Sequence, residues 1–170
     1  MDPTAALQPT GGLSYDQLQV GQTYVSPART ITEGDIAAFA GLSGDYNPLH
    51  TDAIYAEATA FRGRVAHGML VQSIGTGLGW QTGVFSGTIE ALAEVRVRFR
   101  RPVYAGDTLQ LRLSVLELDA APSERRGSVR FGTEIVNQRG QTVLEGDWLT
   151  VMSRRPARRT ILGESAEVGR

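Results

Sequence analysis

The spacing of apolar residues changes once along the chain, near residue 87. Ahead of that point apolar residues recur at the spacing of a helix face, and beyond it they alternate with polar residues, as in strands with one buried face. Helices followed by a run of strands are typical of an α+β domain. We therefore expect an antiparallel sheet that covers a central helix.

Two helices are predicted ahead of the longest apolar segment, after a short extended run over 23–29. Thr32 and Asp35 form an approximate capping box, which predicts a helix that ends near the glycines between 41 and 44. After a bend, the alanine-rich stretch 52–59 suits a second, short helix.

The longest apolar segment, 68–80, is apolar almost all round, which predicts a buried helix. At about 1.5 Å per residue it spans roughly 20 Å, comparable with the width of a small sheet. Gly75, Gly77 and Gly79 lower its helix propensity, and they indicate a close approach to another backbone.

Four strands are predicted after this helix, each from a set of residues at every second position. The alternating runs are Ala93–Phe99, Leu109–Val115, Val129–Ile135 and Val143–Val151, and the turns between the later strands are Pro102–Asp107 and Asn137–Gly140. The first run predicts a half-buried strand. In the last run the alternating set is Val143, Glu145, Asp147, Leu149 and Val151.

Composition narrows the possible functions. The 170 residues suit one domain, for which we expect 14–153, with flexible ends over 1–13 and 154–170. A net charge of -1 gives no support for a nucleic-acid or membrane-surface partner. The absence of cysteine and lysine excludes thiolate nucleophiles, sulfur-ligated metals and Schiff-base chemistry. No signal peptide or membrane span is apparent, so a cytoplasmic protein is expected.

The stretch Ser43–His50 carries the first candidate chemistry. Gly44 tolerates unusual backbone angles and Pro48 fixes its own, so they favour a stiff bend that presents Asp45 and His50, an acid and one of two histidines, as a possible proton-transfer pair. The simpler interpretation is a turn that ends a helix, with Asp45 capping an amide and His50 making one structural hydrogen bond.

His67 and Gly68 stand directly before the long helix, where free amides and the positive end of the helix dipole would stabilise an oxyanion. The Gly68 amide is the best donor. A tight helix entry, with His67 as a structural histidine, explains the same residues equally well.

Three further patterns have weaker support. Asp45, His50, Asp52 and His67 are acceptable metal ligands, but their spacing matches no metal motif, so no metal is expected. Gly75, Gly77 and Gly79 do not form a dinucleotide loop, because Trp80 follows them and no alternating strands and helices do. Arg96, Arg98, Arg100 and Arg101 form a positive strip that could meet substrate phosphates or another subunit, although such strips are usually only solvated.

Three segments together resemble a known family, the MaoC-like dehydratases and type 2, (R)-specific enoyl-CoA hydratases. They are Phe39–His50, with Ala56 after it, then Ala66–Leu70 and Arg101–Asp107, in the family's order. The resemblance implies a hot-dog fold, in which a curved antiparallel sheet wraps a long helix. It also implies a dimer or an assembly of dimers.

The implied reaction is reversible syn addition of water to a trans-2-enoyl-CoA, which gives an (R)-3-hydroxyacyl-CoA without a cofactor. By resemblance, Asp45 and His50 form the catalytic dyad, and the Gly68 amide faces the thioester oxygen. Asn47 and His67 are expected to support the site. Thr76 aligns with a serine that lines the substrate pocket in related enzymes. A hot-dog thioesterase and a non-catalytic acyl-thioester binding subunit remain as alternatives.

Overall fold

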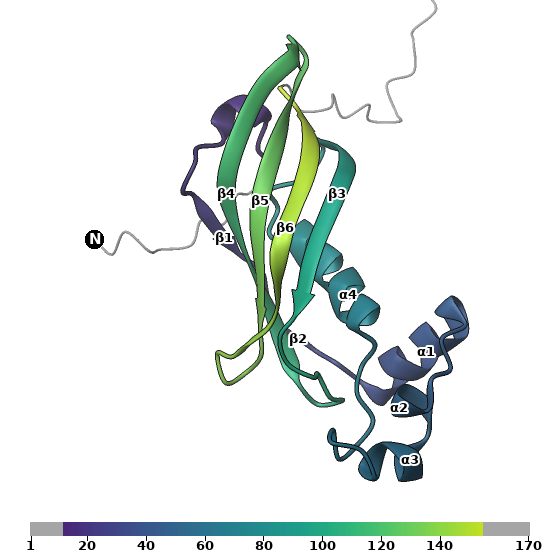
Figure 1. Cartoon of the computed structure of the whole chain (residues 1–170). Helices are drawn as coiled ribbons and strands as arrows, with labels where there is room; N and C mark the ends of the chain where they lie inside the picture. The colour runs from purple at the N-terminus through teal and green to yellow at the C-terminus, as the bar shows by residue number, and fades with distance from the viewer. Residues whose placement is uncertain (1–11, 155–170) are drawn as a thin grey trace, which may run out of the picture.

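The computed structural model describes residues 12–154 and shows a long helix lying against a curved antiparallel sheet (Figure 1). The helical elements are η1 (Tyr15–Gln17), α1 (Glu33–Ser43), α2 (Pro48–Thr51), α3 (Ala53–Glu57) and α4 (Gly68–Gln81). The strands are β1 (Thr23–Val25), β2 (Arg29–Thr30), β3 (Ile89–Phe99), β4 (Thr108–Ser123), β5 (Arg126–Val136) and β6 (Thr142–Ser153). The predicted α+β hot-dog fold is confirmed.

The strand order in the sheet is β1-β4-β5-β6-β3, with β2 also paired to β4. Two successive hairpins join β4 to β5 and β5 to β6, as the alternating runs predicted. The turn between β5 and β6 contains the predicted signal, in which Asn137 Oδ1 accepts from the amides of Arg139 and Gln141 and Gly140 has a φ of 70°. β3 pairs with β6 and so forms one edge of the sheet within the described residues.

The core lies between α4 and the inner face of the sheet. Leu109, Leu111, Leu113 and Phe131 are completely buried there, facing buried α4 residues such as Ile74 and Leu78. Burying large aliphatic and aromatic side chains supplies the main force that holds the helix to the sheet, at roughly 1.5–3 kcal/mol each.

The glycines of α4 admit side chains from the sheet. A Cβ at Gly75 would lie 2.7 Å from Ile135 Cδ1, and one at Gly79 would lie 2.9 Å from Trp148 Cζ3. The close approach predicted from these glycines therefore exists, but the neighbours are side chains and not another backbone. Gly77 has no atom of the described chain within 4 Å of such a Cβ, so this explanation does not apply to it.

Two predictions about strand faces are wrong. In β6 the buried residues Leu144, Trp148, Thr150 and Met152 lie outside the predicted alternating set; of that set only Val143 is buried, whereas Glu145, Asp147, Leu149 and Val151 are partly exposed. Apolar residues occur on both faces of β6, so alternation alone did not identify the inner one. β3 is less buried than predicted, because Leu92, Val95 and Phe99 are exposed while Ile89 and Val97 pack partly against the core.

Both ends of the described chain are tied to the fold. The Leu13 amide donates to Val84 O at 2.9 Å, and the Arg154 amide donates to Arg125 O at 2.9 Å. Leu13 and Arg154 fall in the segments expected to be flexible; the rest of those segments, apart from Gly12, lies outside the described residues. No helix in the described part of the chain is long and apolar enough to cross a membrane.

Candidate active site

The segment that carries Asp45 and His50 projects beyond the end of the sheet, on helices α1 to α3 (Figure 1). α1 begins with the predicted capping box between Thr32 and Asp35. It ends at Gly44, whose φ of 75° lies in the left-handed region that glycine adopts without strain. This reversal directs the chain toward the start of α4.

Hydrogen bonds to side chains shape the bend after α1. Ser43 Oγ donates to Phe39 O at 2.7 Å, and the Asn47 amide donates to Asp45 Oδ1 at 3.3 Å. Asn47 Oδ1 then accepts from the Leu49 amide at 3.0 Å and caps α2, with Pro48 in the first turn. Asn47 therefore stabilises this bend through one hydrogen bond from its amide and one to its side chain.

The sequence interpretation placed His50 on a bend, whereas it lies on α2, a single helical turn. The signal for this turn was present, because an asparagine followed by a proline is a favourable helix start. The following helix is correspondingly shorter than predicted, and Asp52 caps it by accepting from the amides of Ile54 and Tyr55.

The tautomer of His50 follows from its hydrogen bond. Nδ1 lies 2.7 Å from the carbonyl oxygen of Val65. A carbonyl oxygen only accepts, so Nδ1 carries the proton, and the neutral ring keeps its lone pair on Nε2. In this tautomer, Nε2 is the ring nitrogen of His50 that can accept a proton.

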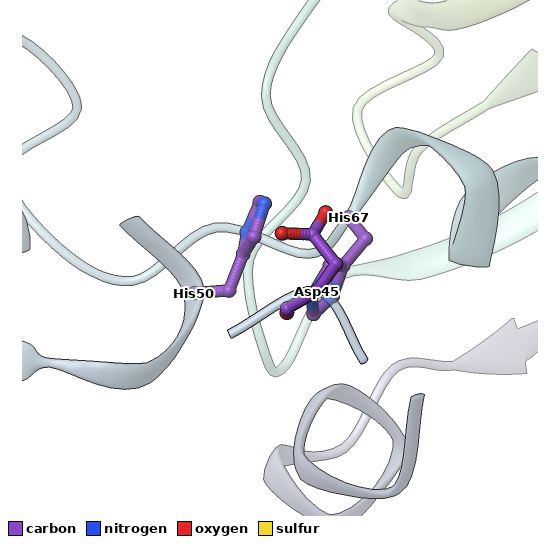
Figure 2. Close-up of side chains that lie close together, drawn as sticks. All are labelled: Asp45, His50 and His67. Atoms are coloured by element: carbon purple, nitrogen blue, oxygen red, sulfur yellow. The ribbon is translucent and has the colours of Figure 1, made fainter. Parts of the chain in front are cut away.

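His67 is the second histidine of the site and is 2% exposed. Its Nε2 lies 2.9 Å from the backbone carbonyl of Asp45, so this nitrogen is the donor. Its ring stacks on that of His50, with centroids 3.7 Å apart and planes at 29°. Figure 2 shows Asp45 and the two rings gathered at one point, although they come from different segments.

A cavity of about 600 Å³ opens beside these side chains. Asp45, His50, His67 and Gly68 all line it, so the structure brings four of the predicted site residues together. Most of its wall is apolar, formed in part by Phe39, Leu49, Phe61, Val71, Phe99 and Val103. The cavity therefore combines an apolar surface with a small group of polar atoms, as is usual in small-molecule sites.

Gly68 begins α4, so its amide is among the first four that helix geometry leaves without an intrahelical acceptor. A Cβ at this position would lie 2.8 Å from Cε1 of Phe99. Only glycine therefore fits here without displacing the Phe99 ring. Sequence reasoning missed Phe99 as part of the site, because its strand is distant along the chain.

Thr76 is not among the residues that line this cavity. It lies on the exposed face of α4, and its Oγ1 donates to Ser73 O at 2.6 Å. Asn47 is also absent from the cavity wall, and it contributes through the cap and the amide bond to Asp45 described above.

Potential metal-ligand atoms of Asp45, His50 and His67 lie within 4.8 Å of one another. His50 Nδ1 and His67 Nε2 are occupied by backbone carbonyls. The remaining lone pairs lie in the planes of two stacked rings and so do not converge well on one ion. The donor set therefore fits a metal poorly, and the absence of a metal from the mechanism stays a prediction.

The positive strip, which begins on β3 and continues just beyond its end, is partly neutralised by carboxylates. Arg96 pairs with Glu94 at 2.6 Å, Arg100 pairs with Glu145, and Arg101 donates to Thr142 O at 2.6 Å. The hydrogen bond from Arg100 holds the pKa of Glu145 below its usual value. Arg100 and Arg101 also line the cavity, which leaves a phosphate-binding role open to them.

Residues 16–137 match the family model described as "MaoC like domain". The chain is 36% identical to the (R)-specific enoyl-CoA hydratase of Rhodospirillum rubrum over 139 residues, which cover 81% of this chain and 90% of that protein. It is 40% identical over 100 residues to protein MaoC of Klebsiella aerogenes, covering 59% of this chain and 30% of that longer protein.

Among solved structures, the unliganded R-hydratase PhaJ1 of Pseudomonas aeruginosa superposes with a TM-score of 0.70 at 37% identity. The match covers 86% of this chain and 87% of that one.

Proposed function

The chain belongs to the MaoC-like family, and we propose that it is an (R)-specific enoyl-CoA hydratase, equally a 3-hydroxyacyl-CoA dehydratase. The observation that supports the proposal is that Asp45, His50 and Gly68, the first residue of α4, line one largely apolar cavity. Relatives named as hydratases and dehydratases support a hydro-lyase.

In the proposed hydration, one water molecule is held between Asp45 and His50. Its oxygen attacks C3 of the enoyl thioester while Nε2 of His50 accepts one of its protons. A proton returns to C2 with the help of Asp45, so the net change is addition of one water. The fixed tautomer of His50 supports this assignment, since the accepting nitrogen is the one not bonded to Val65.

Charge moves to the thioester oxygen as C3 is attacked. We assign the Gly68 amide to that oxygen, because a free amide at a helix start stabilises negative charge. In the proposal one water contacts both Asp45 and His50, and the side chains of these residues offer polar atoms within 4.8 Å of each other. Oxygen and hydrogen then reach the double bond from the same side, which is syn addition.

Kinetics of Asp45→Asn and His50→Ala test the proposal. Each variant should lower turnover of crotonyl-CoA by roughly two to four orders of magnitude, the usual effect of losing an acid or base. Asp52→Asn is a matched control, because it removes one carboxylate two residues from His50 and keeps an oxygen to cap α3. Absorbance of the enoyl thioester follows the reaction, and near wild-type rates in both dyad variants would contradict the dyad.

The same panel separates the alternatives. A thioesterase releases free thiol, which a thiol reagent detects, whereas a hydratase consumes the enoyl band without thiol release. A non-catalytic binding subunit would bind acyl thioesters and turn over neither enoyl nor 3-hydroxyacyl substrates. The intact pair of Asp45 and His50 favours the hydratase over both.

We also infer a homodimer. The edge strand β3 exposes Leu92, Val95 and Phe99, and α4 exposes Met69 and Trp80. An exposed edge strand with apolar side chains favours pairing with another strand, and a second copy offers an identical one.

A further inference from the structure

We infer that His67 is a positioning residue that fixes the placement of Asp45 relative to His50. The inference rests on the proposed function, in which these two residues act on one water. His67 contacts each of them in a different way, through a ring nitrogen and through a ring face.

The first contact restrains the loop that carries Asp45. Nε2–H of His67 donates to the backbone carbonyl of Asp45 at 2.9 Å. The carboxylate of Asp45 belongs to an exposed residue, and the only hydrogen bond to it within the described chain comes from the Asn47 amide at 3.3 Å. The hydrogen bond from the buried His67 ring to the Asp45 carbonyl is thus shorter than the one from the Asn47 amide to the Asp45 carboxylate.

The second contact restrains the ring of His50. The rings stack at 3.7 Å, so His67 blocks one face of His50, while Val65 O holds its edge through Nδ1. Val65 also donates its amide to Leu49 O at 3.1 Å. The segment 65–67 therefore contacts His50 at its ring face and ring edge, and also contacts the backbone of the preceding residue.

This segment is itself fixed to the core. The amide of Ala66 donates to Val103 O at 2.7 Å, and both residues are buried. Phe39 of α1 lies against His67 with ring centroids 5.1 Å apart. His67 is thus held by the core and in turn contacts both residues of the proposed dyad.

Position 67 needs a flat ring and a donor together. Phenylalanine supplies the ring face without the N–H, and glutamine supplies an N–H without the ring. Nδ1 of His67 is buried and has no hydrogen-bond partner among the described residues. Since Nδ1 makes no such bond, the contribution of His67 comes from the hydrogen bond of Nε2 and from the stacking of its ring face.

The test compares His67→Phe and His67→Gln with wild type in the full chain, by kinetics on crotonyl-CoA and by NMR of the substrate-free protein. Because the sequence has only two histidines, His50 is the sole imidazole in either variant, and untagged protein gives it a single set of ring signals. We expect kcat to fall roughly 10- to 100-fold, as for misplaced catalytic groups, with KM changed less than about threefold. The His50 signals should shift and broaden in both variants.

Val129→Ala controls for lost stability, because Val129 is buried in β5 and lines no part of the cavity; it should keep the wild-type kcat. Unchanged kcat and unchanged His50 signals in both His67 variants would overturn the inference. A loss of kcat with unmoved His50 signals and an equal loss in Val129→Ala would also overturn it, as a stability effect. If wild type hydrates no enoyl thioester, the proposed function fails, while the His50 signals still decide whether His67 positions that ring.

Discussion

Two backbone carbonyls decide how the histidines of the site can act. Val65 O fixes the proton of His50 on Nδ1, and Asp45 O fixes that of His67 on Nε2. The two residues therefore have opposite tautomers and different tasks: His50 presents a lone pair at Nε2, and His67 presents a donor to the loop. In the proposed function, one residue type thus supplies both the base and the residue that positions it.

Gly68→Ala tests how closely Phe99 covers the start of α4. The new Cβ would lie 2.8 Å from the ring, so Phe99 must move within the cavity wall. We expect kcat/KM for crotonyl-CoA to fall roughly 10- to 100-fold. The free energy of unfolding should fall by no more than about 1–3 kcal/mol, the usual cost of overpacking, because Phe99 is half exposed and can shift.

Phe99→Leu in the Gly68→Ala background should recover part of the activity by making room for the Cβ. Gly41→Ala is the matched control, since its Cβ would meet only Tyr46 Oη, at 3.7 Å. That change should raise helix stability by about 0.5–1 kcal/mol and leave kcat/KM unaltered. Wild-type kinetics in Gly68→Ala would show that the ring does not confine the thioester.

At the scale of elements, the capping box of α1 links acid stability to the site. The Thr32 amide donates to Asp35 at 2.8 Å, and Arg29 pairs with the same carboxylate at 2.6 Å. The Thr32 amide, and after it the Thr32 hydroxyl and the Arg29 charge, hold the pKa of Asp35 below its usual value. The helix that leads into Asp45 therefore begins at a carboxylate that is more stable ionised.

Because the folded pKa of Asp35 is lowered, its stabilising effect is complete above the unfolded pKa, about 3.9, and is lost as the pH falls through the folded value. We expect Asp35→Asn to reduce the loss of unfolding free energy that wild type shows between about pH 5 and pH 2. Urea unfolding at several pH values measures it. If the free energy of unfolding changed equally with pH in the two proteins, Asp35 would contribute nothing to acid stability.

Element prediction succeeded where a local rule applied. The capping box at Thr32 and Asp35, the glycine at the end of α1 and the Asn137–Gly140 hairpin are all short-range signals, and all are confirmed. The inner face of β6 was predicted wrongly, because both of its faces carry apolar residues and only the position of α4 selects one. The turn α2 was missed although Asn47 and Pro48 signalled it.

At the scale of the whole molecule, the exposed apolar edge predicts association. Val95 on β3 is 39% exposed at the sheet edge. We expect wild type to be dimeric by light scattering after size-exclusion chromatography, and Val95→Asp to shift the population toward monomer, because a charge in an apolar interface is costly to bury.

Val20→Asp is the control for this shift, since Val20 is 63% exposed but lies outside β3 and α4. It should leave the mass unchanged. A monomeric wild type at micromolar concentration, or equal masses for all three proteins, would contradict the homodimer.

The sequence by itself determined the order of α1, α4 and the strands β3 to β6, the capping of α1, the family and the residues of the candidate dyad, since all of these depend on neighbours along the chain. Only the tertiary structure decided which histidine nitrogens are free, which face of β6 is buried, that Phe99 covers Gly68 and that Thr76 lies away from the cavity. These depend on contacts between distant segments. The spacing of apolar residues predicts whether a segment is a helix or a strand, but it does not predict which other segment packs against it.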